Sequence, residues 1–190
     1  MDSNKPSRWN VTNSRYIVKN RWIALRSDDC ITSDGRELTD YYVLEYDTWV
    51  NCLVIADDGQ VTLLKHYRYA VNEDVLELVA GKTEGEDPDH VIERELEEEV
   101  GLVGAEIHKV GTTYANPASH TNLVYSYVAI GGTFDGKLYD ELGAEFEIVR
   151  MSLQELLDKI DSSSVTMQGM QLAGIFMARK LLKQKGLWPE

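Results

Sequence analysis

Three glutamates with helical spacing are the side chains in this sequence most suited to chemistry. In the run RELEEE at positions 94–99, Glu95 and Glu99 are one helical turn apart, and Glu98 lies beside them. Three carboxylates on one helical face repel one another unless a cation neutralises them. Mg²⁺ prefers oxygen ligands and often bridges carboxylates to phosphates. The spacing therefore indicates a divalent cation site that could orient a water nucleophile and neutralise charge on a diphosphate.

The alternative interpretation is an ordinary solvated helix face, because charged helical faces usually belong to the protein surface. The flanking residues favour the functional interpretation, since Arg94 directly precedes the cluster and Gly81 and Gly101 lie on either side of it.

A helix must position these carboxylates, and the sequence marks both of its ends. Asp87 is a suitable N-cap, Pro88 suits the first helical position, and Gly101 is a typical C-terminal stop. Apolar residues recur at helical spacing within these limits and should face the core. They are Ile92, Leu96 and Val100.

The other expected elements give a mixed α/β domain with a β-rich N-terminal arm. Asp-Gly turns are expected at 32–36 and 57–59, and helices at 152–160, with Ser152 as the cap, and at 167–185. Short runs rich in aromatic and β-branched residues predict the strands. These runs are Arg15–Val18, Trp22–Arg26, Tyr41–Tyr46, Trp49–Ala56, Val61–His66, Val75–Val79, Glu106–Tyr114, Leu123–Ile130 and Phe146–Met151.

Composition narrows the classes of function. The 190 residues include 32 acidic and 19 basic ones, for a net charge of −13, which disfavours binding to a nucleic-acid backbone. No apolar run approaches the roughly 18 residues of a membrane span, and the polar start lacks the apolar stretch of a signal peptide. Cys30 and Cys52 lie in separate segments and do not resemble a disulfide framework or a zinc site. We therefore expect a cytoplasmic protein with no nucleic-acid or membrane partner.

The segment 81–102 resembles the Nudix box, Gly-x5-Glu-x7-Arg-Glu-(apolar)-x-Glu-Glu-x-Gly-(apolar). The match covers the first glutamate and every fixed position of the second half: Glu86, Arg94, Glu95, Leu96, Glu98, Glu99, Gly101 and Leu102. The one departure is a loop of four residues, rather than five, between Gly81 and Glu86. We interpret it as a one-residue deletion in a loop, where length changes are usually tolerated.

This resemblance implies a Nudix fold, with a mixed β-sheet sandwiched between helices (α/β/α) and an N-terminal antiparallel β arm. It divides the chain into an arm at 1–48 and a hydrolase domain at 49–190. Related enzymes are homodimers whose N-terminal strands exchange. The cofactor it implies is Mg²⁺, with Mn²⁺ as a second option.

The run LELVAG at 76–81 is similar to the ADP-ribose pyrophosphatase branch of the family, as is Pro117, fifteen residues past Leu102. By that resemblance Arg68, Glu77 and Pro117 would contact substrate. The alternatives are a surface salt bridge for Arg68 and a strand-end surface charge for Glu77. The metal ligands would be the Ala80 carbonyl, Glu95, Glu98 and Glu99, and the catalytic residues Glu98, Glu99, Glu145 and Arg94.

The resemblance does not fix which carboxylate acts as the general base, or which aromatic ring stacks on the nucleobase. Glu145 and then Glu141, in the acidic loop before the last strand, are the candidates for the base. The loop after Pro117 lacks the usual glycine and acidic residue, and His120 there would touch substrate or cap the loop. Aromatic residues for the nucleobase are Trp22, Tyr16 and Trp49, unless they fill a core or a dimer interface.

The expected function is therefore Mg²⁺-dependent cleavage of ADP-ribose or a related nucleoside diphosphate sugar into nucleoside monophosphate and sugar phosphate. The alternatives within the family are GDP-mannose, a dinucleoside polyphosphate or NADH as substrate. The alternative to an enzyme is a ligand sensor that keeps the Nudix fold but does not catalyse a reaction. The intact acidic residues of the box disfavour this alternative.

Overall fold

A computed structural model of the chain describes residues 8–135 and 146–189, which fold into two compact units. The first unit comprises the described residues up to Asp47 together with Tyr114–Asn122. The second comprises Thr48–Thr113 and the described residues from Leu123 onward. The N-terminal part of the chain thus forms one unit with a loop that lies far from it in sequence.

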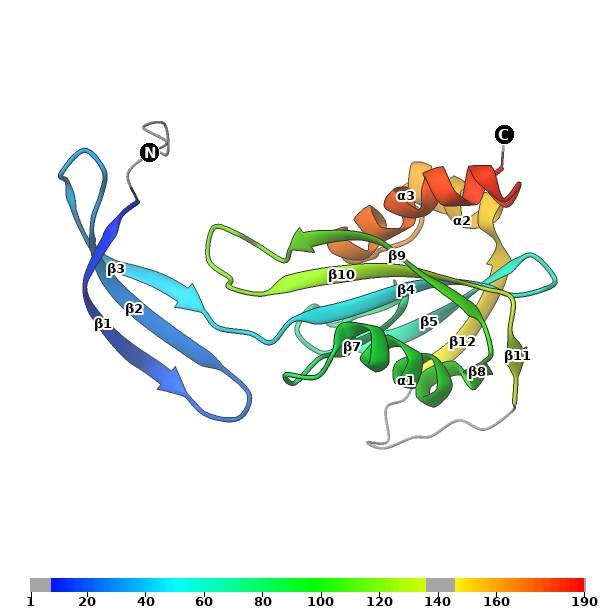
Figure 1. The fold of residues 1–190 in the computed structure, drawn as a ribbon, viewed down its shortest axis with the longest axis horizontal. Helices are drawn as coiled ribbons and strands as arrows, with labels where there is room; N and C mark the ends of the chain where they lie inside the picture. Colours follow the sequence, from blue (N-terminus) through cyan, green and yellow to red (C-terminus); the bar gives the residue numbers. More distant parts are fainter. Residues whose placement is uncertain (1–7, 136–145, 190) are drawn as a thin grey trace. The chain divides into compact units, whose positions relative to one another are not determined.

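The first unit is a three-stranded antiparallel sheet in the order β1-β2-β3 (Figure 1). Its strands are β1 (Asn10–Lys19), β2 (Ala24–Ile31) and β3 (Glu37–Leu44). The expected Asp-Gly turn joins β2 to β3: Gly35 has φ 84°, and the Thr32 amide donates to the Arg36 carbonyl at 2.9 Å. All three strands therefore form the antiparallel β arm that the sequence predicted.

The predicted strand Trp22–Arg26 was wrong at its start. The side chain of Asn20 accepts hydrogen bonds from the amides of Trp22 and Ile23, at 2.8 and 3.1 Å, and closes a turn there. An asparagine that bonds to backbone amides two or three residues ahead competes with strand pairing. β2 consequently begins at Ala24 and continues to Ile31.

The second unit is built on a seven-stranded mixed sheet with the order β12-β5-β4-β10-β9, in which β6 pairs with β5 and β7 pairs with β4. β4 and β10 pair in parallel, whereas β5 pairs antiparallel with β4, β6 and β12, and β7 pairs antiparallel with β4. β8 (Leu102–Val103) forms a separate ribbon with β11 (Thr133–Phe134). The strands of the large sheet are β4 (Trp49–Ile55), β5 (Gln60–Arg68), β6 (Glu73–Glu77), β7 (Val79–Lys82), β9 (Glu106–Tyr114), β10 (Leu123–Ile130) and β12 (Phe146–Ser152).

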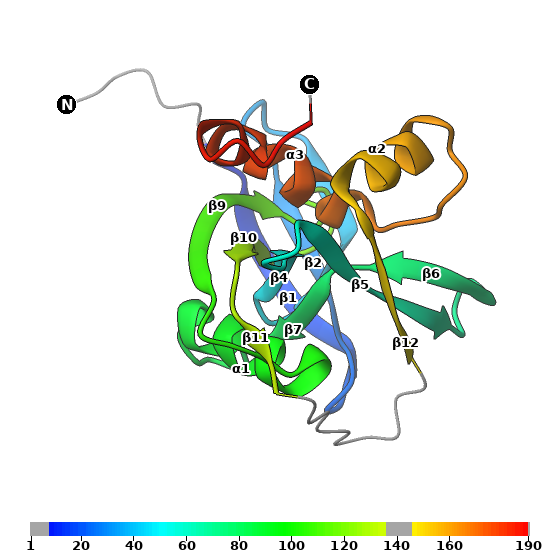
Figure 2. The same ribbon diagram turned by 90° about the vertical axis from the view of Figure 1, so that its right-hand side faces the viewer.

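Helices cover both faces of this sheet, which confirms the predicted α/β/α layering (Figure 2). α1 (Pro88–Val100) packs on the face that carries Val50, Cys52 and Val54, while α2 (Leu153–Asp161) and α3 (Gly169–Gln184) pack on the face that carries Leu53 and Ile55. Because side chains alternate along a strand, β4 buries both of its faces and has a nearly continuous apolar sequence.

The predicted hairpin around 57–59 is confirmed, with the Gly59 amide donating to the Ala56 carbonyl at 2.9 Å. The single strand predicted at 75–79 was wrong: it is two strands that meet at Leu78 and pair with different neighbours, β5 and β4. The two short strands β8 and β11 had no counterpart in the prediction. Within the described ranges, none of the helices is both long enough and apolar enough to cross a membrane.

Candidate active site

The helix α1 carries the acidic cluster, and its ends are those that the sequence predicted. The Asp87 side chain accepts from the Asp89 amide at 2.9 Å, Pro88 opens the helix, and Gly101 ends it at φ 66°. A left-handed backbone conformation at this position favours glycine, because glycine has no Cβ to clash. The buried side of α1 is formed by Val91, Ile92, Leu96 and Val100, the last three as predicted.

Two of the three glutamates point from α1 at the backbone of β7. The Glu99 carboxylate accepts a hydrogen bond from the Ala80 amide at 3.1 Å. The Glu95 carboxylate lies so close to Gly81 that a Cβ at this position would overlap it. The run LVAG therefore brings a bare backbone edge against the acidic helix, and a side chain at position 81 would have to displace the Glu95 carboxylate.

Burial and like charge both act on the Glu99 carboxyl. Loss of solvent contact is the main cause that raises its pKa to about 8, and the neighbouring charges of Glu95 and Glu77 raise it further. The Ala80 amide and the Arg68 guanidinium act in the opposite direction. A carboxyl that is costly to ionise beside another carboxylate is a position where a bound cation would be strongly favoured.

Arg94 lies among the acidic side chains and neutralises part of their charge. Its guanidinium is 2.8 Å from Glu86, 3.8 Å from Glu95 and 3.8 Å from Glu98. These contacts raise the pKa of Arg94, chiefly through the hydrogen bond to Glu86. Glu95 and Glu98 thus both lie near Arg94, and Glu95 and Glu99 face β7.

The donor set fits Mg²⁺, which prefers carboxylate and carbonyl oxygens. The environment of Glu99 supports this fit, because its half-buried carboxyl is repelled by the negative charges of Glu95 and Glu77. Among residues 8–135 and 146–189, no three acidic, histidine or cysteine side chains already converge closely enough to hold an ion. The oxygen donors that could hold an ion here are the carboxylates of Glu95, Glu98 and Glu99 and the Ala80 carbonyl.

Arg68 and Glu77 form a two-point ion pair next to this cluster. Arg68 Nε donates to Glu77 Oε1 at 2.9 Å, and Nη2 donates to Oε2 at 2.6 Å. The Glu77 side chain is only 4% exposed, whereas that of Arg68 is 48% exposed. Both were predicted to touch substrate. The geometry favours Arg68 for such a contact and Glu77 as the group that holds Arg68 in place.

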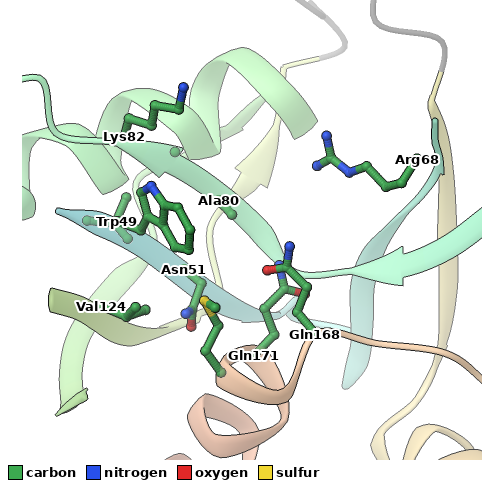
Figure 3. Close-up of a pocket in the computed structure, with 11 residues that line it drawn as sticks. Trp49, Asn51, Arg68, Ala80, Lys82, Val124, Gln168 and Gln171 are labelled. Carbon is green, nitrogen blue, oxygen red and sulfur yellow. The ribbon is translucent and has the colours of Figure 1, made fainter. Parts of the chain in front are cut away.

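A pocket of about 330 Å³ lies on the other side of β7, bordered by β4, β10, the end of β5 and the start of α3 (Figure 3). Figure 3 shows Trp49 on one wall, Arg68 reaching in from the opposite side, and Gln168 and Gln171 between them. Its further lining residues are Val50, Asn51, Ala80, Gly81, Lys82, Val124 and Met170.

Sequence reasoning missed the carboxamides of this pocket. Asn51 is 2% exposed within an otherwise apolar strand, and Gln171 is 3% exposed and accepts from the Leu78 amide at 3.0 Å. A polar residue inside the run WVNCLVI was the signal that could have identified Asn51. Gln168 gave no such signal, because it lies at the start of α3 in an unremarkable polar turn.

The remaining candidates belong to the first unit. Trp22 is 70% exposed and stacks with Arg21, while the Tyr16 hydroxyl donates to Glu45 at 2.8 Å. Neither residue is in a core. Pro117 is exposed in the Tyr114–Asn122 loop, and the ring of His120 there packs edge-on against Tyr46 at 5.3 Å.

The His120 amide also donates to the Asn116 carbonyl at 2.7 Å, which agrees with a role in closing the loop. Glu145 and Glu141, the two candidates for the general base, lie outside the described residues.

Residues 46–167 match the family model of the NUDIX domain, which is more than half of the chain. The chain belongs to the Nudix family. Residues 9–44 of this Nudix protein match the nucleoside diphosphate sugar hydrolase N-terminal domain, which confirms the resemblance to that branch.

Several curated proteins are similar to this Nudix chain. It is 29% identical over 120 residues to the ADP-ribose pyrophosphatase of Bacillus subtilis (strain 168), covering 61% of this chain and 64% of that protein. It is 27% identical to the methanol dehydrogenase activator of Bacillus methanolicus, over 62% and 64% of the two chains. It is 32% identical to the GDP-mannose pyrophosphatase of Yersinia pestis (strain Pestoides F), over 49% and 50%. The matches thus span less than two thirds of these relatives' lengths.

A solved structure described as an ADP compounds hydrolase has the same fold. Its TM-score is 0.83 at 20% sequence identity, and the match covers 98% of this chain and all of that one. This likeness confirms the Nudix fold over the described chain.

Proposed function

We propose that this Nudix protein hydrolyses the diphosphate bond of ADP-ribose or a related nucleoside diphosphate sugar. Water would add to phosphorus and the bridging P–O bond would break, giving nucleoside monophosphate and sugar phosphate. The observation that carries the proposal is the pair Glu95 and Glu99 held against the β7 backbone, beside an arginine fixed by Glu77. Carboxylates and a cationic side chain are thereby placed together, as a diphosphate and its counterion require.

Mg²⁺, held by Glu95, Glu98, Glu99 and the Ala80 carbonyl, would supply positive charge to the diphosphate and lower the pKa of a bound water. The chain's own residues have separate tasks. Arg68 would bind a phosphate oxygen, because its guanidinium is held in one orientation and remains half exposed. Arg94 would keep Glu98 in place through their 3.8 Å contact.

We also propose Glu145 as the general base, with Glu141 as the alternative. Glu145→Gln and Glu141→Gln should then differ, with the true base losing at least a hundredfold in kcat while binding of substrate persists. Equal, small losses in both variants would assign the base to another carboxylate.

A homodimer formed through the arm at residues 1–48 is part of the proposal. All ten residues of β1 are exposed in the single chain, and they include Val11, Tyr16, Ile17 and Val18. Four exposed apolar side chains on one strand form a surface that a partner could cover. Sedimentation should give twice the 21.5 kDa chain mass, and a monomer at micromolar concentration would rule the dimer out.

The decisive experiment measures product release from ADP-ribose, ADP-glucose, GDP-mannose, a dinucleoside polyphosphate and NADH. Each is tested with Mg²⁺, with Mn²⁺ and with EDTA, using the parent chain, Glu99→Gln and the control Glu97→Gln, which alters the exposed side of the same helix. We expect metal-dependent cleavage of the sugar nucleotides, which Glu99→Gln abolishes and Glu97→Gln does not. If only the dinucleoside polyphosphate or NADH is cleaved, that compound replaces the nucleoside diphosphate sugar as the proposed substrate. Binding without turnover would favour a sensor.

A further inference from the structure

A buried tyrosine ties the large sheet to the first turn of the acidic helix. Tyr127 of β10 is 2% exposed, and its hydroxyl donates to the Asp89 carboxylate at 2.5 Å. Burial raises the pKa of this hydroxyl, and the hydrogen bond to Asp89 raises it further, so the group stays protonated and acts as the donor. A buried tyrosine hydroxyl needs a partner, and here the partner lies on α1, the helix that carries the acidic cluster.

Tyr127 lies under α1 on the apolar side of this helix. Its side chain belongs to the same buried cluster as Ile92, Leu96 and Val100. Asp89 falls on that side too, because positions 89, 92, 96 and 100 follow the three- and four-residue spacing of one helical face. Packing between apolar side chains is non-directional, whereas a hydrogen bond fixes both a distance and an angle. The bond from Tyr127 to Asp89 therefore restricts sliding and rotation of α1 in a way that the apolar contacts do not.

The connection that leads into α1 is held from a second strand. The loop 83–87 joins β7 to α1, and it is the loop that is one residue shorter than in the Nudix box. The Thr83 amide donates to the Thr48 carbonyl at 2.9 Å, just before β4, and the Glu86 amide donates to the Thr83 carbonyl at 2.7 Å. Because β4 and β10 are neighbouring strands, the start of α1 is fixed by a tight turn at one strand and by Tyr127 at the next.

The carboxylates further along α1 meet β7 in contacts that tolerate little movement. Glu95 lies so close to Gly81 that a Cβ there would overlap it, and Glu99 accepts from the Ala80 amide at 3.1 Å. Each residue of an α-helix adds a rise of about 1.5 Å and a rotation of about 100°. A displacement of α1 by one residue would therefore break the bond to Ala80 and turn both carboxylates away from β7. Both contacts thus depend on where the helix is held at its start.

We propose that Tyr127 is a positioning residue of this site, which acts through Asp89 to hold α1 so that Glu95 and Glu99 meet the backbone of β7. The role of the two glutamates as cation ligands rests on the proposed function, but the position of α1 can be measured without metal or turnover. The inference adds to the site a residue of β10, a strand that lies outside the Nudix box.

Four single variants of the full chain and one double variant isolate this bond. Tyr127→Phe removes the hydroxyl and keeps the ring in the core. Asp89→Asn keeps an oxygen that can accept from Tyr127, whereas Asp89→Leu does not. Tyr125→Phe is the matched control, because Tyr125 lies two residues earlier on β10 and packs against the same cluster. The double variant Tyr127→Phe, Asp89→Leu completes a double-mutant cycle.

The first measurement is the NMR chemical shift of the Ala80 amide proton in EDTA. Because this amide is bonded to the Glu99 carboxylate, Tyr127→Phe should move its signal upfield, while the amide signals of Leu53 and Val54 in the core of β4 stay in place. Asp89→Leu should give the same change as Tyr127→Phe, and the double variant no larger one. Asp89→Asn should keep the signal of the parent chain.

The second measurement is Mn²⁺ binding, followed by electron paramagnetic resonance. Tyr127→Phe and Asp89→Leu should each weaken it about fivefold, the usual worth of one hydrogen bond, and Asp89→Asn should restore most of the affinity. A loss of stability alone changes neither the Ala80 signal nor the Mn²⁺ affinity of a chain that is still folded. Thermal unfolding of each variant therefore sets the measuring temperature.

Two results would overturn the inference. One is that Tyr127→Phe changes the Ala80 signal and the Mn²⁺ affinity no more than Tyr125→Phe does, in which case Tyr127 only fills the core. The other is that Asp89→Asn behaves like Asp89→Leu, which would assign the effect to the charge of Asp89. If the parent chain binds no Mn²⁺ and cleaves nothing, yet the Ala80 signal responds to Tyr127→Phe and not to Tyr125→Phe, the proposed function fails and the positioning of α1 stands.

Discussion

Replacing Glu99 with glutamine should abolish hydrolysis and at the same time stabilise the metal-free protein at alkaline pH. The folded-state pKa of Glu99 is raised from 4.5 to about 8 by burial and by the charges of Glu95 and Glu77. The folded protein therefore keeps this proton at pH values where the unfolded chain has released it. Stability is fully retained below about pH 4.5 and is lost as the pH rises towards 8. Glutamine has no charge to bury and can still accept from the Ala80 amide.

The size of the effect follows from the same shift. At about 1.4 kcal/mol for each pH unit, the displacement of the pKa sets an upper limit of roughly 5 kcal/mol. Glu99 is only half-buried, so solvent screens part of this cost, and we expect about 2 kcal/mol at pH 8. For a chain of this length that corresponds to a melting temperature about 4–8 °C higher in Glu99→Gln.

The assay is thermal unfolding in EDTA at pH 5 and pH 8, with Glu97→Gln as the control on the same helix. The parent chain should lose stability between these two pH values, and Glu99→Gln should lose clearly less. Adding Mg²⁺ at pH 8 should stabilise the parent chain and have little effect on the variant. Equal pH dependence in the parent chain and Glu99→Gln, or a less stable variant at pH 8, would refute the argument from burial.

Three further predictions follow from the same site. Gly81→Ala should lower kcat at least tenfold by displacing the Glu95 carboxylate. An unchanged kcat would contradict the close contact between position 81 and Glu95. Arg68→Ala should reduce the free energy of unfolding by about 2 kcal/mol in urea titration, because the buried Glu77 loses its partner, and the double variant Arg68→Met, Glu77→Leu should recover most of it. Asp87→Ala should cost about 1 kcal/mol in the same titration through loss of the helix cap, without a specific effect on KM.

The acidic helix could be predicted from the sequence because its information is local. The N-cap Asp87, Pro88, the apolar spacing and Gly101 each act within one or two turns, and the structure has all of them. The prediction was weaker where side chains compete with the backbone, as at Asn20, whose turn moved the start of β2 past Trp22. Strand pairing, which divided the predicted strand 75–79 into β6 and β7, depends on neighbours distant in sequence.

By itself, the sequence determined the family and the helix that carries Glu95, Glu98 and Glu99, because spacing along one helix fixes a shared face. Only the tertiary structure decided what each carboxylate meets. Packing of α1 on β7 partly buries Glu99 at the Ala80 amide and raises its pKa, while Arg94 makes its short contact with Glu86. The pocket between Trp49 and Arg68 likewise exists only because β4, β5, β7 and α3 converge there, and no stretch of sequence contains that arrangement.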